Sequence, residues 1–324
     1  MPSFHITVSD SVFPNLDPAR QVLSSIGAEL RMADSPTPEG IVAAAAASDA
    51  LLVTYAKITA EMIQKMPKIR VISRFGIGVD NVDIEAASAR RIVVTKVPDY
   101  CIDEVSDHAM ALLLAIVRKI PSSSARTHGG RWEMKAVVPI HRLRGSVLGL
   151  AGFGRIPQLV APKAQAFGMK VIAYDPFVPE DVFRKAGVDR VDLATLIATS
   201  DYVSIHTPLT PETKHLFNRE TFGQMKRGAY IVNTARGPII DEAALAEALD
   251  SGQIAGAALD VMSQEPPPPS PLFGRDNVII TPHTSFYSEE SLVELQVKAA
   301  QEVVSVLSGN APRNPVNPEV LAQR

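Results

Sequence analysis

The sequence predicts an α/β protein with two units, each built on a parallel sheet that carries helices on both faces. The first observation is that short β-rich runs alternate with helical patterns along the chain. The second is that this alternation occurs twice, on either side of a long apolar helical segment and an irregular stretch. With 324 residues, 46% of them hydrophobic, the chain is large enough for two cores.

The first alternation covers roughly the first hundred residues. Its expected strands are FHITVS (4–9), ALLVTY (50–55), IRVISR (69–74) and IVVTKV (92–97). Its expected helices cover residues 17–28, 59–66 and 81–89. Asp17 is a plausible N-cap of the first helix, with Pro18 at the first helical position.

A long helix is expected from Glu104 to Ile120. It is apolar nearly all round its middle, which predicts that it is buried. Residues 121–143, which include the single tryptophan Trp132, read as irregular.

The second alternation begins at Ser146. Its expected strands are residues 146–152, 171–175, 202–206, 229–233, 255–260 and 278–283, and its helices are residues 162–168, 193–200 and 242–252. A last helix is expected over 289–307, where its position allows it to pack back on the N-terminal unit.

Composition excludes several classes of function. The net charge is −3 and the pI is 6.2, so there is no electrostatic footprint for nucleic acid or for an anionic membrane surface. The single cysteine, Cys101, excludes an intrachain disulfide. The N-terminus lacks the pattern of a signal peptide, and the apolar run Ala109–Val117 is far shorter than the ~20 residues of a membrane span. A soluble cytoplasmic protein is therefore expected.

The stretch SVLGLAGFGRIPQLV (146–160) has the pattern of a strand, a glycine turn and a helix. Gly152 suits the tight turn and Gly154 the close approach of a pyrophosphate, but Pro157 stands where the third glycine of a dinucleotide fingerprint is usual. If Gly154 is the N-cap, the amides of Arg155 and Ile156 face the anion. Pro157 then lies in the first turn, where a missing N–H is tolerated.

Asp175 supports this interpretation. It lies 21 residues after Gly154 at the end of the next expected strand, where an acid binds the ribose hydroxyls of NAD and repels the extra phosphate of NADP. The alternative is a helix-capping aspartate before Pro176.

Three further strand ends carry Arg236, Glu265 and His283. In an open α/β sheet the ligand crevice lies at the carboxyl ends of the strands, so these groups can converge. Hydride transfer to a 2-ketoacid needs a cation for the carboxylate, a histidine to exchange the hydroxyl proton and a carboxylate to orient that histidine. Taken singly, the three have simpler interpretations: a surface salt bridge, a solvated acid and a capped loop residue. His108 and His206 are interpreted as structural, and no metal site is predicted.

At this point the chain resembles the D-isomer-specific 2-hydroxyacid dehydrogenases over nearly its whole length. The matching motifs are RFGIGVDNVD (74–83), GFGRI (152–156), HTPLTPET (206–213), VNTARG (232–237), AALDV (257–261), EPPP and TPH. The segments VPDYCIDEVSDHAMALLLA and SFYSEESL look most like the branch that contains the C-terminal binding proteins and phosphoglycerate dehydrogenase-like proteins.

The resemblance implies a flavodoxin-like substrate domain, residues 1–99 plus 287–324, and a Rossmann NAD-binding and dimerisation domain, residues 100–286. It implies a small 2-hydroxy or 2-keto acid as substrate, NAD as cofactor and a homodimer. By motif match, Arg236 holds the substrate, His283 is the acid/base and Glu265 its partner, whereas the substrate carboxylate meets Arg74 and the amides of Ile77 and Gly78. The implied cofactor contacts include Thr207, Thr234, Ala235 and Asp260, the last at the nicotinamide carboxamide.

Two departures and two alternatives stay open. Pro157 puts cofactor affinity in question, and Phe286 stands where the branch often has Trp, so its substrate pocket need not transfer. Trp132 resembles an arm residue that reaches the neighbouring subunit's active site, or else packs within the arm.

The alternatives to a ketoacid reductase are a phosphoglycerate dehydrogenase without a regulatory domain and a non-catalytic NADH-binding scaffold similar to the corepressors. Because the chain ends at Arg324, the first of these is expected to lack that domain.

Overall fold

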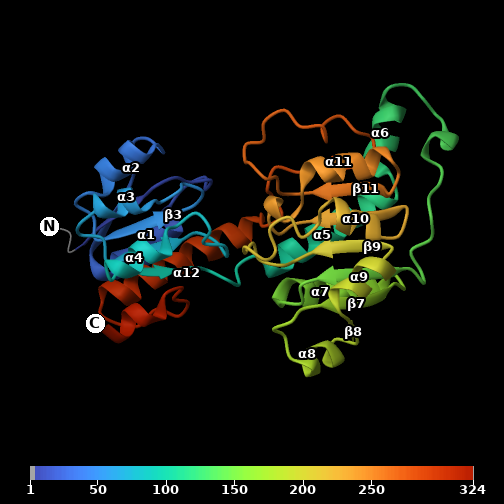
Figure 1. Cartoon of the computed structure of the whole chain (residues 1–324). Coiled ribbons are helices and arrows are strands. Elements are labelled where there is room, and N and C mark those ends of the chain that lie inside the picture. The colour runs from blue at the N-terminus through green and yellow to red at the C-terminus, as the bar shows by residue number, and fades with distance from the viewer. Residues whose placement is uncertain (1–3, 324) are drawn as a thin grey trace. The chain divides into compact units, whose positions relative to one another are not determined.

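A computed structural model describes residues 4–323, which form two compact units (Figure 1). The first unit combines the residues up to Tyr100 with those from Ser288 onward, and the second runs from Cys101 to Tyr287. Each unit has its own sheet, and every strand pairing in both sheets is parallel. The predicted α/β fold with two parallel sheets is confirmed.

The sheet of the first unit has the order β2-β1-β3-β4-β5. Its strands are β1 (Phe4–Val8), β2 (Ala28–Met32), β3 (Ala50–Val53), β4 (Val71–Arg74) and β5 (Val93–Thr95). Strand β2 and the helix after it were not predicted. The residues of AELRM alternate between apolar and charged, but all five types favour helices over strands.

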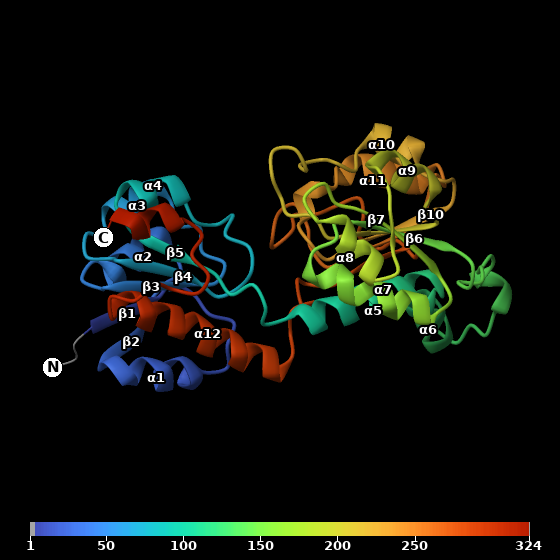
Figure 2. The ribbon, with the colours of Figure 1, turned by 90° about the horizontal axis from the view of Figure 1, so that it is seen from below.

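Helices cover both faces of this sheet. On one face an apolar cluster joins α2 (Pro38–Ala45), α3 (Ala60–Gln64) and α4 (Ile84–Ala89) to the strands. On the other, α1 (Asp17–Leu23) packs along α12 (Glu289–Leu307), as Figure 2 shows. Successive strand residues point to opposite faces, so Ile72 joins the cluster while the buried hydroxyl of Ser73 donates to the carbonyl of Ala299 in α12 (3.1 Å). The C-terminal helix thus completes the N-terminal unit.

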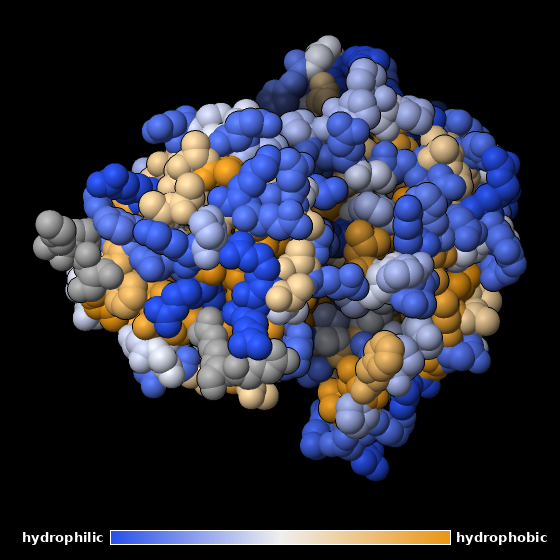
Figure 3. Space-filling model, turned by 60° about the vertical axis from the view of Figure 1, so that its left-hand side comes forward, coloured by the Kyte–Doolittle hydropathy of each residue, from blue (hydrophilic) through white to orange (hydrophobic). Residues whose placement is uncertain are grey.

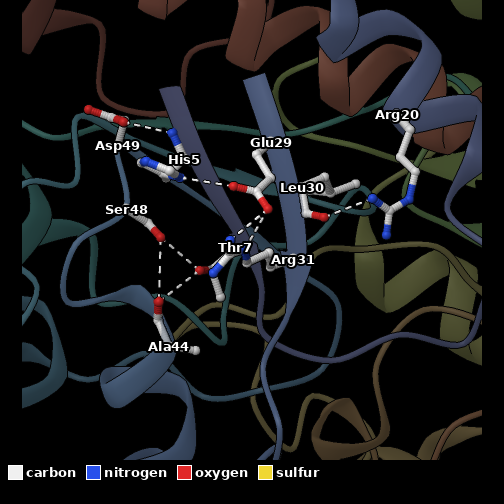
Figure 4. A network of polar contacts seen from close by, with 9 residues as sticks. All are labelled: His5, Thr7, Arg20, Glu29, Leu30, Arg31, Ala44, Ser48 and Asp49. Atoms are coloured by element: carbon white, nitrogen blue, oxygen red, sulfur yellow. Dashed lines mark hydrogen bonds and ion pairs between the residues drawn. The ribbon is translucent and has the colours of Figure 1, made fainter. Parts of the chain in front are cut away.

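The exposed edge of this sheet, strand β2, carries charge (Figure 4). The Arg20 guanidinium donates to the carbonyl of Leu30 (2.8 Å), and Glu29 lies 2.7 Å from Arg31 and 3.5 Å from the His5 ring. Charged side chains on an edge strand disfavour pairing with another sheet. We therefore interpret this network as protection of the edge.

The sheet of the second unit has the order β12-β11-β10-β9-β6-β7-β8. Its strands are β6 (Val147–Ala151), β7 (Lys170–Tyr174), β8 (Asp189–Arg190), β9 (Tyr202–Ile205), β10 (Ala229–Asn233), β11 (Ile254–Leu259) and β12 (Val278–Ile280). The strand order reverses direction between β6 and β9, and such a switch point is where doubly wound sheets bind ligands, at the carboxyl ends of the strands.

Apolar clusters hold three helices on each face of this sheet. One face carries α5 (Ile102–Val117), α7 (Arg155–Ala166) and α8 (Glu180–Lys185), and the other α9 (Leu193–Thr199), α10 (Arg219–Gln224) and α11 (Glu242–Asp250). Half of the residues of α5 are buried, which confirms the prediction made from its apolar middle.

Two local predictions were wrong, and a third is refined. Helix α1 begins at Asp17 itself, with Leu16 at the N-cap and no capping side chain; the Asp17 amide donates to the side chain of Asn15 (3.0 Å). The stretch after α5 is not wholly irregular, since α6 (Ile120–His128) follows Lys119, whose left-handed φ of 54° redirects the chain. Helix α7 is continuous through Pro162 and ends at Ala166, so it joins the helix expected after the glycine turn to the expected segment 162–168.

Polar residues cover most of the face drawn in Figure 3, with small apolar patches between them. Among residues 4–323, no helix is both long and apolar enough to cross a bilayer.

Candidate active site

The glycine turn after β6 has the geometry that a dinucleotide requires. Gly154 is the N-cap of α7, and the amides of Arg155 and Ile156 open the helix. Gly152 has a φ of +99°, and a Cβ there would lie 2.8 Å from the carbonyl carbon of His206, so only glycine fits. A Cβ on Gly154 would meet nothing within 4 Å, which leaves open space in front of the helix N-terminus. Pro157 lies in the first turn of an intact helix, as predicted.

Asp175 follows β7 and lies against this turn. Its Oδ2 accepts from the amide of Phe153, between the two glycines, at 2.9 Å. Its Oδ1 accepts from the amides of Phe177 (2.9 Å) and Val178 (3.2 Å). The carboxylate is therefore held in place beside the helix N-terminus rather than capping a later helix, since α8 starts at Glu180 with Pro179 at its N-cap.

On the other side of the switch point, two hydroxyls are buried without partners. Within the described part of the chain, Thr207 Oγ1 after β9 and Thr234 Oγ1 after β10 are enclosed and make no hydrogen bond. A buried polar atom without a partner costs free energy unless a ligand or water satisfies it. Together with the open space at Gly154, these atoms fit a bound dinucleotide that runs across the switch point.

His283 and Glu265 form a close pair. His283 Nδ1 lies 2.6 Å from Glu265 Oε2, and the two side chains are 22% and 33% exposed. The other carboxylate oxygen, Oε1, accepts from the amide of Met262 (3.0 Å), which fixes the carboxylate. The predicted acid/base and its predicted partner, 18 residues apart in sequence, are thus in contact.

Arg236 follows the neighbouring strand β10. Asn233 shapes its turn: the side chain donates to the Arg236 carbonyl and accepts from the Ala235 amide, both at 2.9 Å. The next residue, Gly237, lies so close to the segment leading to Glu265 that a Cβ would fall 2.1 Å from the Met262 carbonyl oxygen. The loops that carry Arg236 and Glu265 therefore pack backbone to backbone.

Asp260, at the end of β11, has a fully buried side chain. Its Oδ1 accepts from the Thr281 hydroxyl (2.6 Å) and the Thr284 amide (2.9 Å), and its Oδ2 accepts from the Ser285 amide (2.9 Å). Its carboxylate thus holds the loop of His283, and its implied contact with the nicotinamide stays a prediction. The sequence did not single out Thr281, although it opens the TPH motif.

The remaining predicted substrate contacts belong to the first unit. Arg74 ends β4 and donates to the carbonyl of Phe75 (2.7 Å). Gly76 has a φ of +146°, and a Cβ there would overlap the Arg74 guanidinium, so the glycine gives that side chain its space. Ile77 and Gly78 follow directly. Because they lie in the unit that lacks His283, their joint action with it stays a prediction.

His206, after β9, is bonded to Ser204 (2.9 Å between Nε2 and Oγ). The residue keeps some exposure, yet its surroundings desolvate the ring, and burial lowers the pKa of His206 from 6.5 to about 3. Its imidazole is therefore neutral at physiological pH, which suits the structural role expected from the sequence.

The comparisons with known proteins agree with this geometry. Residues 110–285 match the D-isomer specific 2-hydroxyacid dehydrogenase family through its NAD binding domain. The D-3-phosphoglycerate dehydrogenase of Methanocaldococcus jannaschii is 41% identical over 306 residues, which are 94% of this chain and 58% of that protein. The chain thus spans little more than half the length of this curated relative.

Two solved structures have the same fold. The TT0316 protein of Thermus thermophilus matches with a TM-score of 0.87 at 35% identity, over 96% of this chain and 99% of that one. D-lactate dehydrogenase from Aquifex aeolicus, complexed with NAD and lactic acid, matches with a TM-score of 0.86 at 28% identity, over 96% and 98%. Taken with the glycine turn and the residues at the switch point, these findings show that the chain belongs to the D-isomer specific 2-hydroxyacid dehydrogenase family and carries its NAD-binding domain.

Proposed function

We propose that this protein is an NAD-dependent D-2-hydroxyacid dehydrogenase that works mostly as a 2-ketoacid reductase. The observation that carries the proposal is the 2.6 Å contact between His283 Nδ1 and Glu265 Oε2, at the sheet edge where Arg236 also lies. A carboxylate on one ring nitrogen stabilises the charged imidazole and fixes its orientation.

NAD, when bound, exchanges the hydride with the carbon that carries the substrate oxygen. Because Nδ1 is engaged with Glu265, we assign Nε2 of His283 to proton exchange with that oxygen. During reduction the imidazolium gives up its Nε2 proton, and its Nδ1–H stays bonded to the carboxylate. The Arg236 guanidinium binds the substrate and polarises its carbonyl, a task for which a planar cation suits.

The cofactor cradle follows from the switch point. The amides of Arg155 and Ile156 face the pyrophosphate in the space left by Gly154, and Asp175 takes the adenosine ribose. Thr207, Thr234, Ala235 and Asp260 line the nicotinamide side. The buried, unpaired hydroxyls of Thr207 and Thr234 support this placement of the cofactor.

A charge in the first unit favours an unphosphorylated substrate. The end of β3 adjoins that of β4, which carries Arg74, and three successive amides of Thr54, Tyr55 and Ala56 point at one carboxylate. That carboxylate belongs to Asp10 at 2.6–3.2 Å, so this anion-binding turn is filled from within and adds a negative charge. The 41% sequence identity to a D-3-phosphoglycerate dehydrogenase makes a phosphorylated 2-hydroxy acid the second candidate substrate.

We also propose a homodimer. The segment from α6 to Val138 carries apolar side chains in solvent: Ile120, Trp132, Met134 and Val138, with Trp132 90% exposed. Exposed Trp and Met in one segment are typical of a protein interface. A second subunit that covers this arm would bury them.

The test is oxidation of NADH and NADPH with glyoxylate, hydroxypyruvate, phosphohydroxypyruvate, pyruvate and a bulky branched ketoacid. Turnover with NADH, and at least about tenfold less with NADPH because of Asp175, supports the proposal. NADH binding without turnover on any ketoacid would instead favour the scaffold alternative, and a stable peptide partner would then be sought by pull-down.

A further inference from the structure

A second histidine reaches the loop of His283 from a different element. His108 lies in α5, and its side chain is 25% exposed. Its Nε2 lies 3.1 Å from Thr281 Oγ1 and 3.6 Å from Asp260 Oδ1. The proposed mechanism makes no use of His108 or Thr281.

The loop depends on Asp260 at four points. The His283 amide donates to the Asp260 carbonyl (2.8 Å), and the carboxylate takes the Thr281 hydroxyl and the amides of Thr284 and Ser285. His283 itself has a left-handed φ of 52°. A residue other than glycine holds that conformation only when its surroundings over-determine it, so the loop needs these bonds.

The direction of each hydrogen bond follows from the donors available. A carboxylate only accepts, so at 2.6 Å the Thr281 hydroxyl donates to Asp260. That hydroxyl has no second hydrogen, so the 3.1 Å contact is a bond from His108 Nε2–H to Thr281 Oγ1. The protons therefore point one way, from His108 through Thr281 to Asp260, and each donor polarises the next bond.

We propose that His108 is a positioning residue, which acts through Thr281 and Asp260 to hold the His283 loop in its active conformation. The inference rests on the proposed function. It gives Asp260 a second role, holding the His283 loop, in addition to its implied contact with the cofactor.

Matched substitutions separate the hydrogen bonds from the shape of the side chains. Thr281→Val and His108→Leu remove a donor, whereas Thr281→Ser keeps the hydroxyl and His108→Gln places an amide N–H near the position of Nε2. We expect each donor-removing variant to lower kcat about tenfold with little change in the dissociation constant of NADH, and each conservative variant to stay within about threefold of wild type. Equal losses in both members of a pair would refute the proposal.

Double variants ask whether the effect passes through His283. In a His283→Ala background the positioning network has no histidine left to place, so His108→Leu should lower the residual rate no further. A further tenfold loss in that background would show a structural role and overturn the inference.

A readout without turnover keeps the test apart from the proposed function. The short His283–Glu265 bond should give a downfield proton resonance, assigned by its loss in His283→Ala. We expect the signal in wild type, Thr281→Ser and His108→Gln, and its broadening or loss in Thr281→Val and His108→Leu. If wild type reduces no ketoacid, the proposed function fails while this signal still decides on the loop. An unchanged signal in all four variants would overturn the inference.

Discussion

Replacing Glu265 by Gln tests the central pair of the site most sharply. The substitution keeps an acceptor for His283 Nδ1 but removes the negative charge 2.6 Å away. A hydrogen bond to a charged partner is worth about 1.5–3 kcal/mol, against about 1 kcal/mol for a neutral one. Both side chains are partly exposed, so water screens some of the difference, and about 1–2 kcal/mol remains.

That free energy stabilises the imidazolium form of His283, which is the proton donor in the proposed reduction. We therefore expect Glu265→Gln to lower kcat for ketoacid reduction at pH 7 by about 5–30-fold, with little change in NADH affinity. The assay is steady-state NADH oxidation, with the dissociation constant of NADH measured in parallel by fluorescence.

Glu242→Gln is the matched control. Glu242 Oε1 accepts from the amide of Ser263 (2.6 Å), so this variant removes a charge that supports the same loop without removing the partner of His283. We expect its kcat to stay within about threefold of wild type. A wild-type kcat in Glu265→Gln, or an equal loss in both variants, would refute the assignment of Glu265.

Three further predictions concern the cofactor turn, stability and assembly. Gly152→Ala should weaken NADH binding at least about tenfold, because the new Cβ meets the His206 backbone. Pro157→Ala should change NADH binding less than about threefold, since an N–H in the first turn of a helix is unpaired in any case. Equal effects of the two variants in a calorimetric titration would contradict this prediction. Burial lowers the pKa of His206 to about 3, so between pH 6.5 and 3 the unfolded chain binds a proton that the folded chain does not. As the pH is lowered through that window, the free energy of unfolding should therefore decrease by up to about 1.4 kcal/mol per pH unit. Denaturant titrations should show a smaller decrease in His206→Gln. Trp132→Asp should shift sedimentation from dimer toward monomer, and a wild-type profile would argue against the arm as the interface.

The regular elements that the sequence predicted well are those with a strong pattern. The six strands of the second alternation and the helix 289–307 were recovered because β-branched runs and 3.6-residue periodicity are local signals. Strand β2 was missed because AELRM, although it alternates, consists of residue types that favour helices, and α6 because SSSARTH is polar all round.

Of the contacts in the candidate site, the sequence could predict those between strand ends but not those between a helix and a distant loop. Strand ends identify which residues gather at one edge of a parallel sheet, so the contact between Glu265 and His283 could be expected without coordinates. The contact of His108 with Thr281 could not, because it depends on which face of α5 packs over β11 and β12. No spacing along the chain encodes a register between a helix and a distant loop.

The most direct test of the account compares wild type with His283→Ala, measuring NADH binding and ketoacid reduction on the same samples. We predict that the variant binds NADH within about threefold of wild type and loses at least about a thousandfold in kcat, because the cofactor cradle is intact and the proton donor is gone. Substantial turnover in His283→Ala, with the best substrate of the wild-type enzyme, would contradict the assignment of His283 as the acid/base.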